Sequence, residues 1–215
     1  MTEPQTVRRY GRAARWFHAG IYLTVLVLLA TGWWFLTGGY FRPSPLSRLT
    51  GLGDGEIHEL TGYAMVLVVL AWLPFGARGL VGFARETFRY ERGDGHWLLA
   101  LPRAAFTGRF RHHDGHFDPG QRLANVAMVG TLVALAGSGL GMLYLPHGAP
   151  QDIAYRVHHW AALLFTPVVL GHIAVAAGIL PGYRGVWRSM HLGGRLPVAV
   201  ARRIWPGWLE RHLNR

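Results

Sequence analysis

Four long runs without a charged residue are the feature that most limits how this chain can fold. They cover residues 16–41, 60–77, 123–151 and 157–183, and charged side chains bound each of them. About 20 apolar residues cross the hydrocarbon core of a bilayer as a helix. Helices are required because an isolated strand would leave its backbone polar groups unpaired in lipid. We therefore predict an all-α, integral membrane four-helix bundle, transmembrane at about residues 16–38, 57–77, 121–145 and 156–180.

The composition agrees with a membrane protein. Of the 215 residues 51% are hydrophobic and only 15% are charged, a balance that is unusual for a soluble domain. Cysteine is absent. Disulfides, iron–sulfur clusters and thiolate zinc sites are therefore excluded, and histidine is the main strong metal ligand that remains.

The positions of the arginines predict the orientation in the membrane. All 22 basic residues are arginine; nineteen lie in residues 1–15, 78–122 and 184–215, and three lie in 42–59 and 146–156. By the positive-inside rule both termini, the loop 78–120 and the tail 184–215 are cytoplasmic. Topology accounts for the net charge of +11, so we expect membrane lipid and no nucleic acid as a partner.

The cytoplasmic loop and tail carry aromatic and leucine residues among their arginines. This pattern predicts short amphipathic segments that lie on the cytoplasmic face of the membrane. With no second domain apparent, we expect residues 1–215 to form a single membrane domain. The first apolar run is too long for a cleavable signal peptide, and no small-residue cleavage site precedes Phe41.

Four histidines in or beside the apolar runs form two predicted pairs. His158 and His172 are fourteen residues apart, which places them within ~40° of the same helix face and roughly 21 Å apart along the axis. The topology puts His58 level with His158 near the periplasm, and His18 level with His172 near the cytoplasm. Opposed histidines at one height are what a bis-imidazole haem requires. We therefore predict two b haems, since the chain has no cysteine for covalent attachment.

Other histidines have less support. His159 is rotated by roughly 140° from the face of His172, so His158 is the preferred ligand. In the loop, His112, His113 and His116 with Asp114 could bind a metal. A solvated polar loop is the favoured interpretation, because nothing in the sequence fixes the geometry of these side chains.

With these residues in view, the chain resembles the gamma subunit of membrane-bound formate dehydrogenase, a four-helix di-haem cytochrome b. The resemblance covers nearly the whole chain. It is carried by R-W-x-H at residues 15–18, the start of the second helix with His58, G-H-F-D-P-G-Q-R at 115–122, V-H-(x13)-H at 157–172 and the tail with W-L-E-R. In that family the ligands pair as His58 with His158 and as His18 with His172, in agreement with the pairing by depth.

The resemblance also implies a quinone site beside the cytoplasmic haem. Its residues would be Asp118, Gly120, Gln121 and His172, although the family pattern has asparagine at the position of Asp118. The same residues have a structural interpretation. Asp118 as N-cap, a proline at the first helical position and Gln121 as a reciprocal cap would begin the third helix without any ligand.

For function, the resemblance implies a subunit of a bacterial inner-membrane oxidoreductase complex. It would pass electrons from an iron–sulfur beta subunit through two b haems to menaquinone or ubiquinone. Formate oxidation would occur on a molybdenum or tungsten alpha subunit, and no catalytic residue is assigned to this chain. The alternatives are the cytochrome b subunit of a nickel–iron hydrogenase or another molybdoenzyme on the same scaffold, and a membrane anchor with no redox role.

Overall fold

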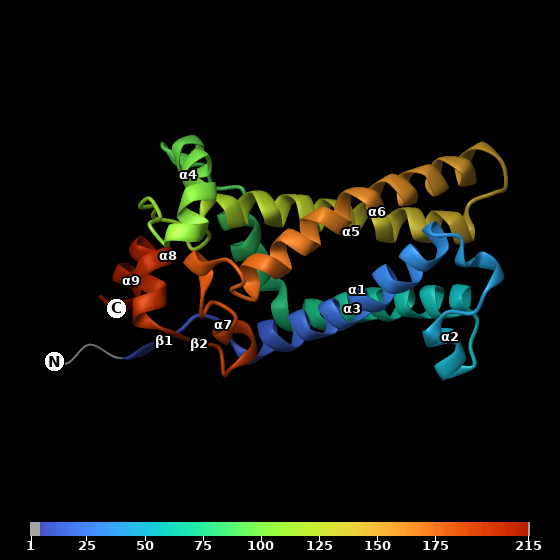
Figure 1. Ribbon diagram of the computed structural model, residues 1–215, viewed down its shortest axis with the longest axis horizontal. Coiled ribbons are helices and arrows are strands. Elements are labelled where there is room, and N and C mark those ends of the chain that lie inside the picture. The colour runs from blue at the N-terminus through green and yellow to red at the C-terminus, as the bar shows by residue number, and fades with distance from the viewer. Residues whose placement is uncertain (1–4, 215) are drawn as a thin grey trace. The chain divides into compact units, whose positions relative to one another are not determined.

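A computed structural model describes residues 5–214, so residues 1–4 and 215 of the predicted domain lie outside the described part. The chain packs as two compact units. We call residues 16–76 and 130–166 the bundle unit, and residues 5–15, 77–129 and 167–214 the terminal unit. Figure 1 labels the helices and strands.

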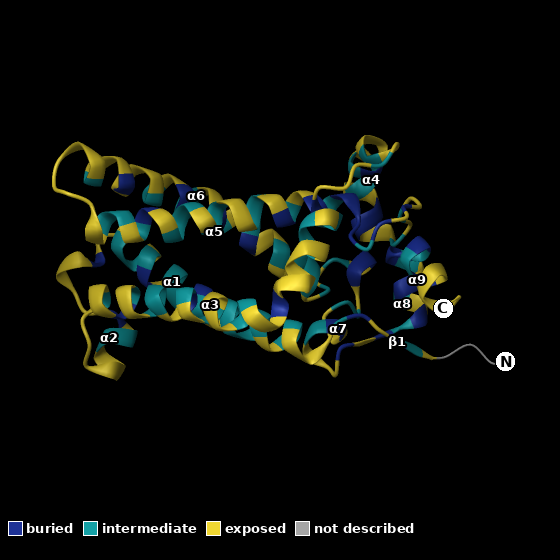
Figure 2. Ribbon diagram, turned by 180° about the vertical axis from the view of Figure 1, so that it is seen from behind, coloured by how far each residue is buried: buried dark blue, intermediate teal, exposed yellow. Residues whose placement is uncertain are grey.

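Four long helices account for most of the chain: α1 (Arg12–Leu36), α3 (Asp54–Thr87), α5 (Pro119–Tyr144) and α6 (Ala149–Ala176). Each is long and apolar enough to cross a membrane. Most of their residues are exposed or half-buried, as Figure 2 shows by the yellow and teal along these ribbons. Large exposed apolar side chains such as Leu23, Leu67 and Leu164 suit a surface that lipid covers. The predicted all-helical membrane fold is confirmed.

Inside the bundle unit, contacts join all four helices. Trp33 of α1 donates its indole N–H to Thr166 of α6 at 3.0 Å. The Tyr63 hydroxyl of α3 lies 2.7 Å from the Tyr144 hydroxyl of α5. The segment between α1 and α3 contains η1 (Gly39–Phe41) and α2 (Pro45–Thr50). The hydroxyl of Ser44 caps the N-terminus of α2. The result is a four-helix bundle with polar contacts between its helices.

The terminal unit has a hydrophobic core of its own. Strand β1 (Thr6–Arg8) pairs antiparallel with β2 (Arg195–Pro197), with Val7 opposite Leu196. The unit also holds α4 (Asp94–Thr107), η2 (Pro181–Tyr183), α7 (Arg188–His191), α8 (Val198–Ile204) and α9 (Pro206–Leu213). Of these, α7 and α8 contact the ribbon, α4 packs on η2 and α9 packs on α8. Figure 2 shows their buried positions in dark blue. The fully buried side chains include those of Leu196, Ile204 and Leu209.

The structure adds to the sequence prediction in two places. Helix α3 continues to Thr87, ten residues beyond the predicted end of the second span, because no proline occurs between Arg78 and Thr87. The loop and tail contain the expected short helices, but they also form a packed core and a β-ribbon that the amphipathic pattern did not predict. Val7 and Leu196, which meet in that ribbon, are 189 residues apart in the sequence.

Candidate functional site

Two of the predicted ligands lie together in the bundle unit. His58 is in the second turn of α3 and His158 is in α6, and both side chains are half-buried. The centroids of their imidazole rings are 6.1 Å apart and the ring planes meet at 73°. Two imidazoles that bind one metal ion from opposite sides, through metal–nitrogen bonds of about 2 Å, have centroids roughly 6 Å apart. The spacing of the two rings therefore fits a shared metal ion.

The His58 ring is held through Nδ1. This atom lies 2.7 Å from the hydroxyl oxygen of Thr31, which is only 2% exposed. The hydroxyl proton of Thr31 is directed to the carbonyl oxygens of Val27 and Leu28 one turn earlier in α1. With its proton on those carbonyls, the Thr31 oxygen is an acceptor for Nδ1–H of His58, and this tautomer has Nε2 unprotonated.

The His158 ring is also held through Nδ1, by residues of α5. Nδ1 of His158 lies 3.1 Å from the carbonyl oxygen of Leu135 and 3.2 Å from the hydroxyl oxygen of Ser138. A carbonyl oxygen can only accept, so Nδ1 of His158 carries the proton. The Nε2 atoms of both histidines thus keep the lone pair that a metal ion needs, and Nδ1 makes the outer hydrogen bond that usually orients such a ligand.

These observations fit haem iron. Bis-imidazole ligation needs two neutral rings from different helices, at one height, with Nε2 available on each. His58 and His158 meet those requirements in this structure. Sequence reasoning identified both histidines but missed Thr31, Leu135 and Ser138; the available signal was a hydroxyl residue beside glycine inside an apolar run.

The second predicted pair is divided between the two units. His18 lies in the second turn of α1 within the bundle unit, where its ring is 5.7 Å from that of Tyr22. His172 lies near the end of α6, within the terminal unit. Both are half-buried. Their pairing around a second haem stays a prediction.

His159 contacts other partners than its neighbour does. Its ring lies 6.2 Å from that of Tyr155 and 5.8 Å from that of Trp160, both on its own helix. His158 instead lies against His58. The two adjacent histidines thus point to different surroundings, as the helical rotation predicted.

Three of the four predicted quinone residues, Asp118, Gly120 and Gln121, lie at the beginning of α5 in the terminal unit, and the fourth, His172, lies in α6. Oδ1 of Asp118 accepts the backbone N–H of Gln121 at 2.8 Å, so the predicted N-cap is confirmed. The predicted reciprocal cap is wrong, because Oε1 of Gln121 is buried and has no hydrogen-bond partner within residues 5–214. A Cβ on Gly120 would lie 3.1 Å from Trp97 and 3.2 Å from Asp118. Asp118 is only 2% exposed, and its contact with quinone stays a prediction.

Burial controls the charge of Asp118. Loss of water raises the pKa of the carboxyl, while the N–H of Gln121 and the positive charge of Arg9 act in the opposite direction. Arg9 is itself buried, and its guanidinium lies 3.6 Å above the ring of Trp205 and 4.7 Å above that of Trp208. The start of α5 thus lies in a buried polar cluster that joins β1, α5 and the tail.

The loop histidines do not form a metal site. His113 is 4% exposed, and its Nε2 atom bonds to the carbonyl oxygen of Ile204 at 2.8 Å. His112 is exposed and lies beside Asp114. Across residues 5–214 no three histidine or acidic side chains come close enough to hold a metal ion. The favoured solvated loop is also wrong in part, since the tail helices bury His113 and most of His116.

The burial of His116 predicts acid sensitivity. Its pKa falls from 6.5 to about 3, chiefly through burial and then through Arg9 and Arg211. Below pH 6.5 His116 becomes protonated in the unfolded chain but stays neutral in the folded chain. The free energy of unfolding therefore decreases as the pH falls towards 3. His116→Phe retains an aromatic ring beside Phe117 and Trp208. We expect this variant to lose less stability between pH 6.5 and pH 3 than the unmodified protein, as measured by its thermal unfolding temperature.

A matched control is available on the same loop. His112→Phe changes an exposed side chain and should keep the acid loss of the unmodified protein. Equal acid loss in His116→Phe and His112→Phe would remove His116 as the cause.

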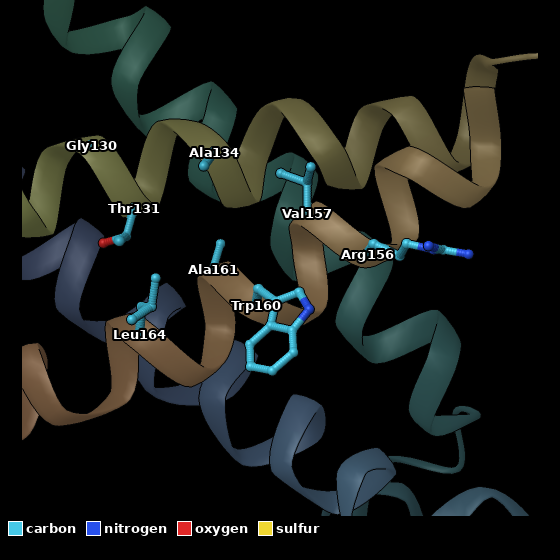
Figure 3. Close-up of a pocket in the computed structure, with 8 residues that line it drawn as sticks. All are labelled: Gly130, Thr131, Ala134, Arg156, Val157, Trp160, Ala161 and Leu164. Carbon is cyan, nitrogen blue, oxygen red and sulfur yellow. The ribbon is translucent and has the colours of Figure 1, made fainter. Parts of the chain in front are cut away.

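A shallow groove of about 370 Å³ lies between α5 and α6 in the bundle unit. Figure 3 shows the side chains that line it, including Thr131, Trp160 and Leu164. Arg156 is the one charged residue among those that line it, and its side chain extends away from the others. Polar groups do not converge within this lining, so the groove has none of the features of a reaction site.

The sequence model of the prokaryotic cytochrome b561 family matches residues 9–193, which include all four predicted haem ligands. No curated protein matches the chain.

Proposed function

Because this chain belongs to the prokaryotic cytochrome b561 family, a family of membrane proteins that bind b haem, we propose that it is the membrane cytochrome b subunit of a formate dehydrogenase complex. It would carry electrons from an iron–sulfur subunit to a membrane quinone. The observation that most supports the haem-binding part of this proposal is the pair of imidazoles 6.1 Å apart, each with Nδ1 in a hydrogen bond and Nε2 left for a metal ion. The choice of formate dehydrogenase rests on the sequence resemblance at residues 15–18, 115–122 and 157–172. When bound, haem supplies reversible one-electron chemistry at its iron.

The residues have distinct parts in this proposal. His58 and His158 hold the haem near the periplasmic face, where the iron–sulfur subunit would deliver electrons. His18 and His172 hold the second haem near the cytoplasmic face. The arginine distribution favours this face as the side on which both termini lie. Quinone reduction there consumes two electrons and two protons and yields quinol.

Quinone contact at Asp118, Gly120, Gln121 and His172 belongs to the same proposal. The buried carboxyl of Asp118 supports a role in proton supply, since its raised pKa keeps a proton on it more readily than on an exposed aspartate. The Oε1 atom of Gln121, three residues later, is a buried acceptor without a hydrogen-bond partner in residues 5–214. Both lie at the beginning of α5.

The donor is tested with membranes that contain the tagged full-length chain. We expect added formate, and not hydrogen, to reduce the b haem, and the iron–sulfur and molybdenum or tungsten subunits to copurify with the tag. Reduction by hydrogen but not by formate, with a hydrogenase in the purified complex, would instead assign the chain to the hydrogenase alternative.

Asp118→Asn tests the role of the carboxyl. Asparagine can still accept the N–H of Gln121, so the start of α5 should be preserved. If Asp118 supplies protons, quinol formation by the unmodified complex slows as rising pH removes its proton, and the asparagine variant is slower at low pH and lacks that decline. Steady-state quinol formation measured across pH checks this. An unchanged profile would leave Asp118 as a helix cap alone.

A further inference from the structure

Each of the two imidazoles is contacted by a hydroxyl residue and the glycine that follows it, on α1 for one ring and on α5 for the other. In α1 the hydroxyl of Thr31 bonds Nδ1 of His58, and in α5 the hydroxyl of Ser138 lies beside Nδ1 of His158. Glycine follows each hydroxyl residue, as Gly32 and Gly139. Thr31 and Ser138 are buried, at 2% and 8% exposure. Neither helix supplies a ligand to this site, yet each contacts one ligand ring.

The glycines lie against the rings themselves. A Cβ on Gly32 would be 3.6 Å from Cε1 of His58, and a Cβ on Gly139 would be 3.4 Å from Cε1 of His158. Those distances are ordinary contact, so alanine fits, but a larger side chain would enter the space of the ring. Each ring is thus bounded by a hydroxyl at Nδ1 and by glycine at Cε1.

The two hydrogen bonds differ in how easily they can be replaced. For His58, Thr31 supplies the acceptor, with a short contact of 2.7 Å. For His158, the carbonyl oxygen of Leu135 lies 3.1 Å from Nδ1, slightly nearer than the Ser138 hydroxyl at 3.2 Å. Removing the Ser138 hydroxyl leaves a backbone acceptor in place, whereas removing the Thr31 hydroxyl takes away the acceptor of His58.

We infer that Thr31 is a positioning residue for His58, and that the dipeptides Thr31–Gly32 and Ser138–Gly139 orient the two ligand rings. The inference rests on the proposed haem ligation by His58 and His158. Thr31 keeps the proton on Nδ1 and so directs the lone pair of Nε2 to the iron. Its acceptor oxygen also increases the electron density of the ring, which stabilises the oxidised iron relative to the reduced iron.

The test replaces the hydroxyl and keeps the shape. Thr31→Val is matched by Thr24→Val, seven residues earlier on α1, where the hydroxyl donates to the carbonyl oxygens of Gly20 and Ile21 in its own helix. Redox titration of the purified, haem-loaded chain measures the midpoint potential of each haem, and electron paramagnetic resonance of the oxidised iron reports on ring orientation. We expect Thr31→Val to raise the potential of one haem and shift its resonance signal, with the other haem unchanged.

The remaining variants define what would contradict the inference. Thr24→Val should leave both potentials unchanged, and Ser138→Ala should give a smaller shift than Thr31→Val, because the carbonyl of Leu135 remains. If Thr31→Val does not assemble, Thr31→Ser and Thr31→Ala are compared, since both lose the methyl group and only serine keeps the hydroxyl. Unaltered potential and resonance in the variant without a hydroxyl would overturn the role of Thr31 while haem binding stands. Absence of haem from the unmodified chain would overturn the proposed ligation itself.

Discussion

Replacing His58 or His158 with alanine is expected to remove the same b haem, and replacing His18 or His172 the other one. The reason is that each iron needs two imidazoles, so the loss of either ligand opens the same site. For His58 and His158 the expectation rests on rings 6.1 Å apart in one four-helix bundle. Haem content per chain, together with the resonance signals of the oxidised irons, identifies which haem is lost.

The neighbouring histidine is the matched control. His159→Ala removes an imidazole one position along α6, where it packs against Tyr155 and Trp160, and should leave both haems in place. Loss of different haems from His58→Ala and His158→Ala would contradict the pairing. Loss of a haem from His159→Ala would show that the wrong histidine of the adjacent pair has been assigned.

Arg9→Ala is the second substitution with a large expected effect. The Arg9 guanidinium is 7% exposed and donates from Nη2 to the carbonyl oxygen of His116 at 2.6 Å. It lies over the rings of Trp205 and Trp208 and supplies positive charge near the buried carboxyl of Asp118. Alanine would remove all of these interactions from the terminal unit. We expect a loss of about 3 kcal/mol in the free energy of unfolding.

Arg8→Ala is the control that distinguishes the loss of buried contacts in Arg9→Ala from the loss of one positive charge. Arg8 lies in β1 and is exposed, so Arg8→Ala removes the same charge without opening a buried site. Thermal unfolding in detergent, followed by tryptophan fluorescence, should show a much lower transition temperature for Arg9→Ala than for Arg8→Ala. Equal transition temperatures would contradict the role of Arg9 in holding β1 to the tail.

The membrane fold could be predicted from the sequence because its signal is local. Charge-free runs bounded by charged residues mark the four long helices wherever they occur in the chain. The choice of His158 over His159 was also local, since helical rotation alone places adjacent side chains on different faces. Pairing His58 with His158 needed one further step, the order of the helices across the membrane.

The terminal unit could not be predicted in this way. Its polar cluster joins Arg9 to His116 across 107 residues, and His113 to Ile204 across 91 residues. Neither periodicity nor composition reports contacts between such distant segments, so a loop rich in histidine and arginine resembled a solvated one. The hydroxyls of Thr31 and Ser138 were missed for a related reason: in a helix, such residues usually bond their own backbone, and both do so here.

The central claim is that this chain binds b haem through histidines of its own helices. The reduced-minus-oxidised absorption spectrum of the purified full-length chain, with haem counted per chain, tests it most directly. We expect b-type bands and two haems per chain, with one haem lost in His158→Ala. A spectrum without b-type bands from a folded, membrane-extracted chain would contradict it.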